Sequence, residues 1–284
     1  MKKFLLLVCF SSFISSELIL EITQGTEDPF RVAIIKFNGD NKAATEIDQI
    51  IKNNLMRSGE FKIFDNDDLL SLPKDEDEIV FNDFRILNID YLIIGNLINE
   101  SSNIKAEYKV YDIRKGSKVR SSTVFGIPNK NRQLAHYISD GIYEEITGIK
   151  GIASTKILYV TQNKDYRLVV ADADGKNEQI LLESSEPIIS PSWSPDSKKV
   201  AYVSFETGIA KVFIQDIASG NREVVIENSS QISSPAWSPD GKFLSLTMYQ
   251  DGNAEIYILN LKNKNLTRLT NHYGIDTEST WSPK

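Results

Sequence analysis

A four-residue phrase that begins with tryptophan recurs every 44 residues in the last third of the chain. It reads Trp-Ser-Pro-Asp at Trp193 and Trp237, and Trp-Ser-Pro-Lys at Trp281. Apolar positions of a short strand repeat at the same interval, as Leu168, Val212 and Ile256. Repetition with a period of about 40–45 residues, combined with short strands, is typical of β-propeller blades. The phrase therefore predicts an all-β propeller.

Three repeat units align, at about residues 155–198, 199–242 and 243–284. We expect each tryptophan ring to pack between neighbouring blades and its N–H group to find a hydrogen-bond partner. Trp193, Trp237 and Trp281 are therefore interpreted as structural blade residues that do no chemistry.

The phrase also predicts a tight turn. Proline presets the φ angle of the second turn position, and the residue after the aspartate needs a positive φ angle. Gly241 satisfies this need, whereas Ser197 occupies the same place in the preceding unit. A left-handed conformation costs a side chain such as Ser197 about 1 kcal/mol.

Residues 17–150 have the pattern of a mixed α/β domain that precedes the propeller at 151–284. Short β-branched runs predict strands at 31–37, 61–64, 91–98, 104–113 and 118–125. Apolar residues three and four apart predict helices at 43–58 and 131–147.

Residues 1–16 have the pattern of a cleavable secretory signal peptide. Lys2 and Lys3 precede an apolar run, and small residues precede Glu17, where we place the cleavage. The run is shorter than the roughly 20 residues that a membrane span needs, so we expect export without membrane insertion. A lipoprotein signal at Cys9 is the less favoured alternative, because no small residue stands directly before that cysteine.

The net charge excludes some classes of binding partner, and the cysteine content shows what can stabilise the fold. The chain has 32 basic and 39 acidic residues, a net charge of −7, which argues against nucleic acid and anionic membrane surfaces. Cys9 is the one cysteine, so the exported part contains no disulfide and depends on its core for stability.

Neither enzymatic nor metal-binding motifs stand out. His136, expected to be partly exposed on its helix, and His272, in a turn, fall in different predicted domains, which disfavours a zinc site. No Gly-x-Ser-x-Gly elbow or phosphate-binding glycine loop occurs. The acidic stretch 65–78 is compatible with calcium, but its spacing favours a solvated loop. We therefore predict a protein that is not an enzyme and has no cofactor or metal.

Four segments together resemble one family. They are the junction 147–151 (Thr-Gly-Ile-Lys-Gly), the stretch 190–196, the stretch 201–208 and the stretch 277–281 (Thr-Glu-Ser-Thr-Trp). With the leader and the α/β domain ahead of the blades, the chain resembles the TolB family, periplasmic proteins of the Tol–Pal system of Gram-negative bacteria. The resemblance covers essentially the whole chain after the leader.

This resemblance implies a binding protein without catalytic activity. In the family a six-bladed propeller takes the lipoprotein Pal at the mouth of its channel, and the mature N-terminus engages TolA and can fold back as a switch. The system supports outer-membrane integrity and envelope constriction during cell division. Carried over by position, the TolA-binding segment is Glu17, Leu18, Ile19, Leu20, Glu21 and Ile22. The Pal-binding positions are Gln231, Ser234, Thr277 and Glu278, although Gln231 stands where the family often has histidine.

The number of units departs from the family, since three blades stand where six are expected. We therefore expect a truncated form. Assembly of two copies into six blades is an alternative. Two further readings stay open: a non-functional remnant, and the propeller of a prolyl-oligopeptidase-like peptidase, which would require a Gly-x-Ser-x-Gly elbow downstream.

Overall fold

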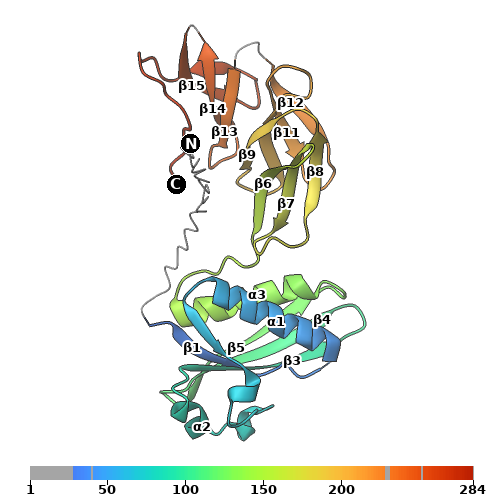
Figure 1. Cartoon of the computed structure of the whole chain (residues 1–284), viewed down its shortest axis with the longest axis vertical. Coiled ribbons are helices and arrows are strands. Elements are labelled where there is room, and N and C mark those ends of the chain that lie inside the picture. The colour runs from blue at the N-terminus through green and yellow to red at the C-terminus, as the bar shows by residue number, and fades with distance from the viewer. Residues whose placement is uncertain (1–27, 40, 228–230, 251, 284) are drawn as a thin grey trace, which may run out of the picture. The chain divides into compact units, whose positions relative to one another are not determined.

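The computed structural model describes residues 28–39, 41–227, 231–250 and 252–283. The chain forms two compact units, Met1–Asn131 and Arg132–Lys284 (Figure 1). The leader predicted at 1–16 and the segment Glu17–Ile22 lie outside the described residues.

The first unit is built on a five-stranded sheet with the order β2–β1–β3–β4–β5. Its strands are β1 (Phe30–Ile34), β2 (Phe61–Phe64), β3 (Tyr91–Asn99), β4 (Ile104–Asp112) and β5 (Ser117–Gly126). β1 pairs in parallel with β2 and β3, and the other pairs are antiparallel. All five strands predicted here are confirmed, and their ends differ by at most three residues.

Parallel strands cannot be joined by a tight hairpin, so β1 and β2 need a crossover. Helix α1 (Asn41–Arg57) supplies it and lies across one face of the sheet (Figure 1). Ala44, Ile47, Ile51 and Leu55 form its buried stripe. A second apolar cluster, with Leu92 and Tyr111 among its members, contains Phe84 of the short helix α2 (Phe81–Ile86). The loop before α2 contains the 3₁₀ turns η1 (Asn66–Asp68) and η2 (Glu76–Glu78).

The second unit contains helix α3 (Asn131–Thr147) from Arg132 onward and three antiparallel sheets. The first sheet has three strands, β6 (Lys156–Gln162), β7 (Tyr166–Asp172) and β8 (Gln179–Ser184). The second has four, β9 (Ile188–Trp193), β10 (Lys199–Ser204), β11 (Lys211–Asp216) and β12 (Arg222–Glu227). The third also has four, β13 (Gln231–Trp237), β14 (Phe243–Gln250), β15 (Asn253–Asn260) and β16 (Leu266–Arg268).

The sheets are offset from the repeat units by one strand. Each repeat unit has its tryptophan near its C-terminal end. In the first two units this tryptophan lies on the first strand of the following sheet, Trp193 on β9 and Trp237 on β13. The four-stranded sheets therefore span 188–227 and 231–268. The domain boundary predicted at residue 150 stays a prediction, whereas α3 belongs by its contacts to the second unit.

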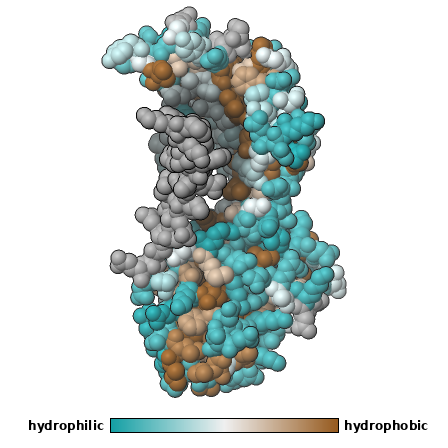
Figure 2. All heavy atoms as spheres, in the orientation of Figure 1, coloured by the Kyte–Doolittle hydropathy of each residue, from teal (hydrophilic) through white to brown (hydrophobic). Residues whose placement is uncertain are grey.

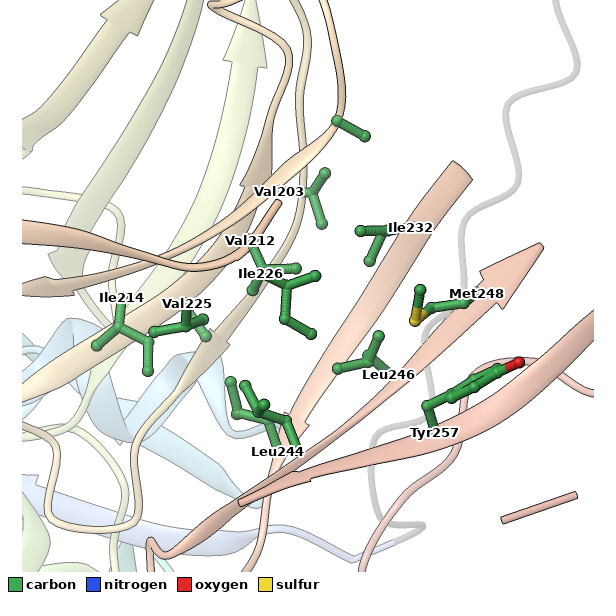
Figure 3. Close-up of a cluster of buried hydrophobic side chains, with 13 residues drawn as sticks. Val203, Val212, Ile214, Val225, Ile226, Ile232, Leu244, Leu246, Met248 and Tyr257 are labelled. Carbon is green, nitrogen blue, oxygen red and sulfur yellow. The ribbon is translucent and has the colours of Figure 1, made fainter. Parts of the chain in front are cut away.

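The second and third sheets bury their apolar faces against each other (Figure 3). Side chains of both sheets form this cluster, among them Val203, Val212, Ile214, Val225, Ile226, Ile232, Leu244, Leu246, Met248 and Tyr257. Trp237 packs against the same cluster. Trp193 packs against a separate cluster that joins the first and second sheets and includes Leu168 and Tyr202.

The turn predicted for the Trp-Ser-Pro-Asp phrase is confirmed. The Ser238 hydroxyl donates to Asp240 Oδ1 (2.6 Å) and accepts the Phe243 N–H (3.0 Å). Ser194 makes the same two bonds in the second sheet, to Asp196 (2.6 Å) and from Lys199 (2.9 Å). The pKa of Asp196 is lowered, mainly by the Ser194 hydrogen bond. Side-chain bonds of this kind fix a turn that the backbone alone closes weakly.

A polar stripe on α3 attaches the helix to the first sheet and to the segment before it. Arg132, His136 and Asp140 recur every fourth residue and so share one helix face. Arg132 pairs with Asp174 just after β7, while Asp140 accepts the backbone N–H groups of Ala153 (2.6 Å) and Ser154 (2.9 Å).

Gly151 makes this attachment possible. A Cβ atom at this position would lie 2.5 Å from Asp140 Cα, a backbone atom that no rotamer change can move. Gly148 has a different role, because its φ angle of 74° ends α3 and nothing lies within 4 Å of its missing Cβ.

We expect Ser197→Gly to raise the free energy of unfolding by about 0.5–1 kcal/mol, because Ser197 has a φ angle of 58° that glycine adopts without strain. The reciprocal change Gly241→Ser, at a φ angle of 69°, should lower it by about 1 kcal/mol. Urea unfolding of both variants measures the pair. A destabilised Ser197→Gly variant would contradict the strain assigned to this turn.

We expect Gly151→Ala to lower the free energy of unfolding by about 1–3 kcal/mol, because the added methyl group overlaps the α3 backbone. Gly148→Ala serves as the matched control and should cost only the conformational term, about 1 kcal/mol. Thermal unfolding of both variants separates the two effects. Equal costs would refute the steric role of Gly151.

Candidate functional site

A non-glycine residue with a positive φ angle recurs three positions before each tryptophan. Ser190, Ser234 and Glu278 have φ angles of 53°, 54° and 56° and are spaced by 44 residues. In β9 and β13 the strand register shifts at this position, which marks a β-bulge. The same irregularity therefore returns on the tryptophan-bearing segment of each successive unit, at positions that include two of the predicted Pal-binding residues.

The structure brings three of the predicted residues together around Thr247, a buried hydroxyl on β14. Thr247 pairs across the sheet with Ser233, the neighbour of Ser234. Its hydroxyl donates to the Thr277 hydroxyl (3.3 Å) and accepts the backbone N–H of Glu278 (3.3 Å). Thr277 and Glu278 are both exposed, so their remaining polar atoms face solvent.

Gln231 lies at the same end of the third sheet, where it is exposed and pairs with Tyr249. We call this end the bulge end and define it by Gln231, Ser234, Thr277 and Glu278. The Trp-Ser-Pro-Asp turn and the β15–β16 hairpin lie at the opposite end of the same sheet, since Phe243 pairs with Asn260 there. Two of the four predicted Pal-binding positions, Gln231 and Ser234, therefore lie on β13. The other two, Thr277 and Glu278, lie beside the same sheet on the segment that is bonded to Thr247.

Trp281 anchors the segment that follows Glu278. Its indole N–H donates to the Ala236 carbonyl (3.1 Å), and its ring stacks on Phe243 with ring centroids 6.5 Å apart. This segment thus lies against β13 without joining the third sheet as a strand. The anchor fixes the chain three residues beyond Glu278.

Two residues were missed from the sequence: Thr247, which lies at this site, and Ser190, the counterpart of Ser234 on β9. Ser190 could have been found from the interval of 44 residues that links it to Ser234 and Glu278. Thr247 is one of two polar residues in the alternating stretch from Leu244 to Met248. Its bonds reach residues 30 and 31 positions later, which no local pattern reveals.

His136, Asp172 and Asp174 form the one group of three metal-ligand side chains close enough for an ion among the described residues. The prediction that His136 is partly exposed was wrong, since the residue is 3% exposed. Lys156 and Arg132 pair with the two carboxylates, and Asn177 donates to Asp172 (2.6 Å).

Burial opposes ionisation of Asp172, but the contacts with Lys156, Asn177 and His136 together outweigh it, and the pKa of this carboxyl is lowered below its usual range. Two cations already balance the two carboxylates, so a divalent ion would meet repulsion here. The cluster therefore joins α3 to the first sheet and does not fit a metal ion.

The acidic stretch of the first unit binds lysines. Glu76 accepts hydrogen bonds from Lys118 (2.9 Å) and Lys109 (3.2 Å), and these bonds, that of Lys118 foremost, lower its pKa. Among the described residues, no three carboxylates of this stretch come close enough to share an ion. The geometry does not support the calcium alternative.

An apolar surface lies on the first unit. Hydrophobic residues gather in Figure 2 over the region where Figure 1 places α2. The exposed large hydrophobic residues between the turn η1 and the end of α2 are Leu70, Leu72, Val80 and Ile86. Such surfaces often contact partners, and the four predicted partner-binding residues that the structure describes belong to the second unit instead.

Two family models match the chain. The TolB amino-terminal domain matches residues 18–119, and the TolB beta propeller domain matches residues 143–284. The matches agree with the α/β unit and the blade sheets described above.

Curated relatives and a solved structure agree with these models. The Tol-Pal system protein TolB of Alcanivorax borkumensis is 44% identical over 210 residues, which cover 72% of this chain and 48% of that protein. The Pseudomonas aeruginosa protein of the same name is 36% identical over 204 residues, 69% of this chain and 47% of that protein. The crystal structure of TolB from Acinetobacter baumannii has a TM-score of 0.84 and 34% identity, covering 90% of this chain and 64% of that one.

The chain spans about half the length of the curated relatives it matches. Both of its structural units nevertheless fall within the match to the solved structure, and their order along the chain is the order of the two family models. This chain belongs to the TolB family.

Proposed function

We propose that this chain is a periplasmic binding component of a Tol–Pal system, with Pal bound at the bulge end and TolA bound by residues 17–22. The observation that carries the Pal site is the convergence of Ser234, Thr277 and Glu278 around Thr247. The exposed side chains of Thr277 and Glu278, on a backbone held by part-buried bonds, suit recognition, because little conformational freedom is lost on binding.

Binding, and not catalysis, is the proposed activity. The carboxylates of the His136 cluster are paired with Arg132 and Lys156, and the Thr247 hydroxyl is hydrogen-bonded to Thr277 and Glu278. A propeller peptidase remains the second class and would require a nucleophile elbow elsewhere in the protein. A Gly-x-Ser-x-Gly sequence in a longer form of the protein would discriminate this class from the binding protein.

Export to the periplasm follows from the proposed leader at 1–16. In the described part of the chain, no helix combines the length and apolar character needed to cross a membrane. We place the role of the protein in outer-membrane integrity and envelope constriction during cell division, as a link between Pal and TolA.

We expect the double variant Thr277→Ala/Glu278→Gln to weaken capture of the periplasmic domain of Pal about thirtyfold, because a charged interface group loses its partner. Titration of labelled Pal domain against the chain measures the affinity. Lys262→Ala is the matched control, since Lys262 is exposed at the opposite end of the same sheet. Unchanged binding by the double variant would refute the site, and no binding by the unaltered chain would refute the function.

We expect removal of residues 17–22 to abolish capture of TolA while leaving Pal binding within about twofold, because the two proposed sites use different segments. Pull-down with the periplasmic domain of TolA tests this. Replacing Thr23, Gln24 and Gly25 by alanine is the control and should retain TolA. Full TolA capture by the shortened chain would overturn the assignment.

A further inference from the structure

The connection between β16 and the bulge end (residues 269–276) contains no helix or strand. Its backbone is nevertheless bonded along its length to β15. Leu269 N–H donates to the Ile256 carbonyl (2.8 Å), and Asp276 N–H donates to the Ala254 carbonyl (2.9 Å). Between these two points, side chains of β15 make the bonds.

Glu255 is the first of these side chains and is 1% exposed. Its carboxylate accepts the Thr270 hydroxyl (2.6 Å), the His272 backbone N–H (2.9 Å) and Arg268 Nη2 (2.8 Å). These bonds, that of Thr270 foremost, lower the pKa of Glu255 to about 2. The carboxylate is therefore ionised throughout the neutral and mildly acidic range, and its bonds to the connection persist there.

Asn253 is the second side chain. Its amide Nδ2 donates to the backbone carbonyls of His272 (2.6 Å) and Gly274 (2.6 Å), while its Oδ1 accepts the Ala254 N–H (2.9 Å). Glu255 thus binds the N–H of His272 and Asn253 binds its carbonyl. Both polar groups of one loop residue are held by a single strand.

The bonds continue without a gap into the bulge end. Asp276 is bonded to β15, and the next two residues, Thr277 and Glu278, are bonded to Thr247 on β14. Although the backbone is held, the connection exposes several large side chains, among them Tyr273 at 95% and Ile275 at 75%. A segment with a fixed backbone and exposed side chains is preorganised for recognition.

We call the bonds of Asn253, Glu255 and Thr247 to residues 269–278 the clamp. Its residues occur only in the third of the three described sheets. The positions of Asn253, Glu255 and Thr247 are taken by Ile209, Lys211 and Val203 in the unit 44 residues earlier. In the unit before that they are taken by Asp165, Arg167 and Tyr159. Those two sheets form without the clamp, so the sheet itself does not require it.

We propose that Glu255 and Asn253 are positioning residues for Pal recognition, which hold the connection 269–276 in one conformation and thereby preset Thr277 and Glu278 for the partner. The inference rests on the proposed function, since it names residues that act through the Pal site. A conformation populated only in part would lower the apparent affinity by that fraction.

Amide hydrogen exchange of the chain without partner tests the clamp directly. Glu255→Gln and Asn253→Ala should each speed exchange in the peptide covering 270–278 by about tenfold, because opening of the loop becomes easier. Glu255→Gln also weakens the Glu255–Arg268 ion pair and could unfold the sheet more widely. Asn253→Ala keeps that pair, so faster exchange in this variant reports on the connection alone. Glu183→Gln, in an exposed pair with Arg167 on the first sheet, is the matched control. Unchanged exchange in Asn253→Ala and in a folded Glu255→Gln would overturn the proposal.

Pal binding then separates positioning from mere stability. We expect Asn253→Ala to weaken the Pal affinity about tenfold, with the melting temperature and the exchange of the first sheet unchanged. Full affinity in Asn253→Ala, while Thr277→Ala/Glu278→Gln binds weakly, would overturn the positioning role and leave the proposed function intact. Full affinity in both would remove the proposed Pal site itself.

Discussion

Burial of apolar faces between successive sheets is the interaction on which the second unit depends. A four-stranded antiparallel sheet cannot shield its apolar faces by itself, so each sheet is stable only against a neighbour. The cluster of Figure 3 takes its members from two sheets, and the cluster around Leu168 and Tyr202 joins the first sheet to the second. Stability is therefore shared along the row of sheets.

Irregular backbone occurs within these packed sheets. β14 and β15 pair in an unbroken register, whereas the pairs β7–β8, β9–β10 and β11–β12 each contain a register shift. The left-handed residues Ser190 and Ser234 lie on the first strand of each four-stranded sheet, where the register already shifts. Strained positions of this kind persist because packing on both sides determines them. At the bulge end, Ser234 lies between Ile232 and Trp237, which both pack in the cluster shared with the second sheet.

Polar side chains fix the turns and the connection 269–276, and they attach helix α3. Ser238 with Asp240 closes the turn at one end of the third sheet, and Asn253 with Glu255 fixes the connection at the other. On α3, the stripe of Arg132, His136 and Asp140 attaches the helix to the first sheet and the segment before it. In each case a buried or half-buried polar group is bonded, so burying it costs little.

Local patterns were sufficient to predict the five strands of the first unit, helices α1 and α3 and the repeated blades, although not the short helix α2. The periods of two and 3.6 and the interval of 44 residues are properties of neighbouring positions. They were also sufficient for the left-handed Ser197, since its turn spans a few residues. The burial of His136, the one-strand offset of the sheets and the bonds of Thr247 and Glu255 depended on contacts between residues distant in sequence. The apolar stripe of α3 was visible in the sequence. The role of its polar stripe could be recognised only from the contacts with Asp172 and Asp174 in the folded structure. By itself, then, the sequence determined which elements form. Only the tertiary structure decided which polar groups meet, because a polar residue has no preferred partner until folding brings one within hydrogen-bond distance.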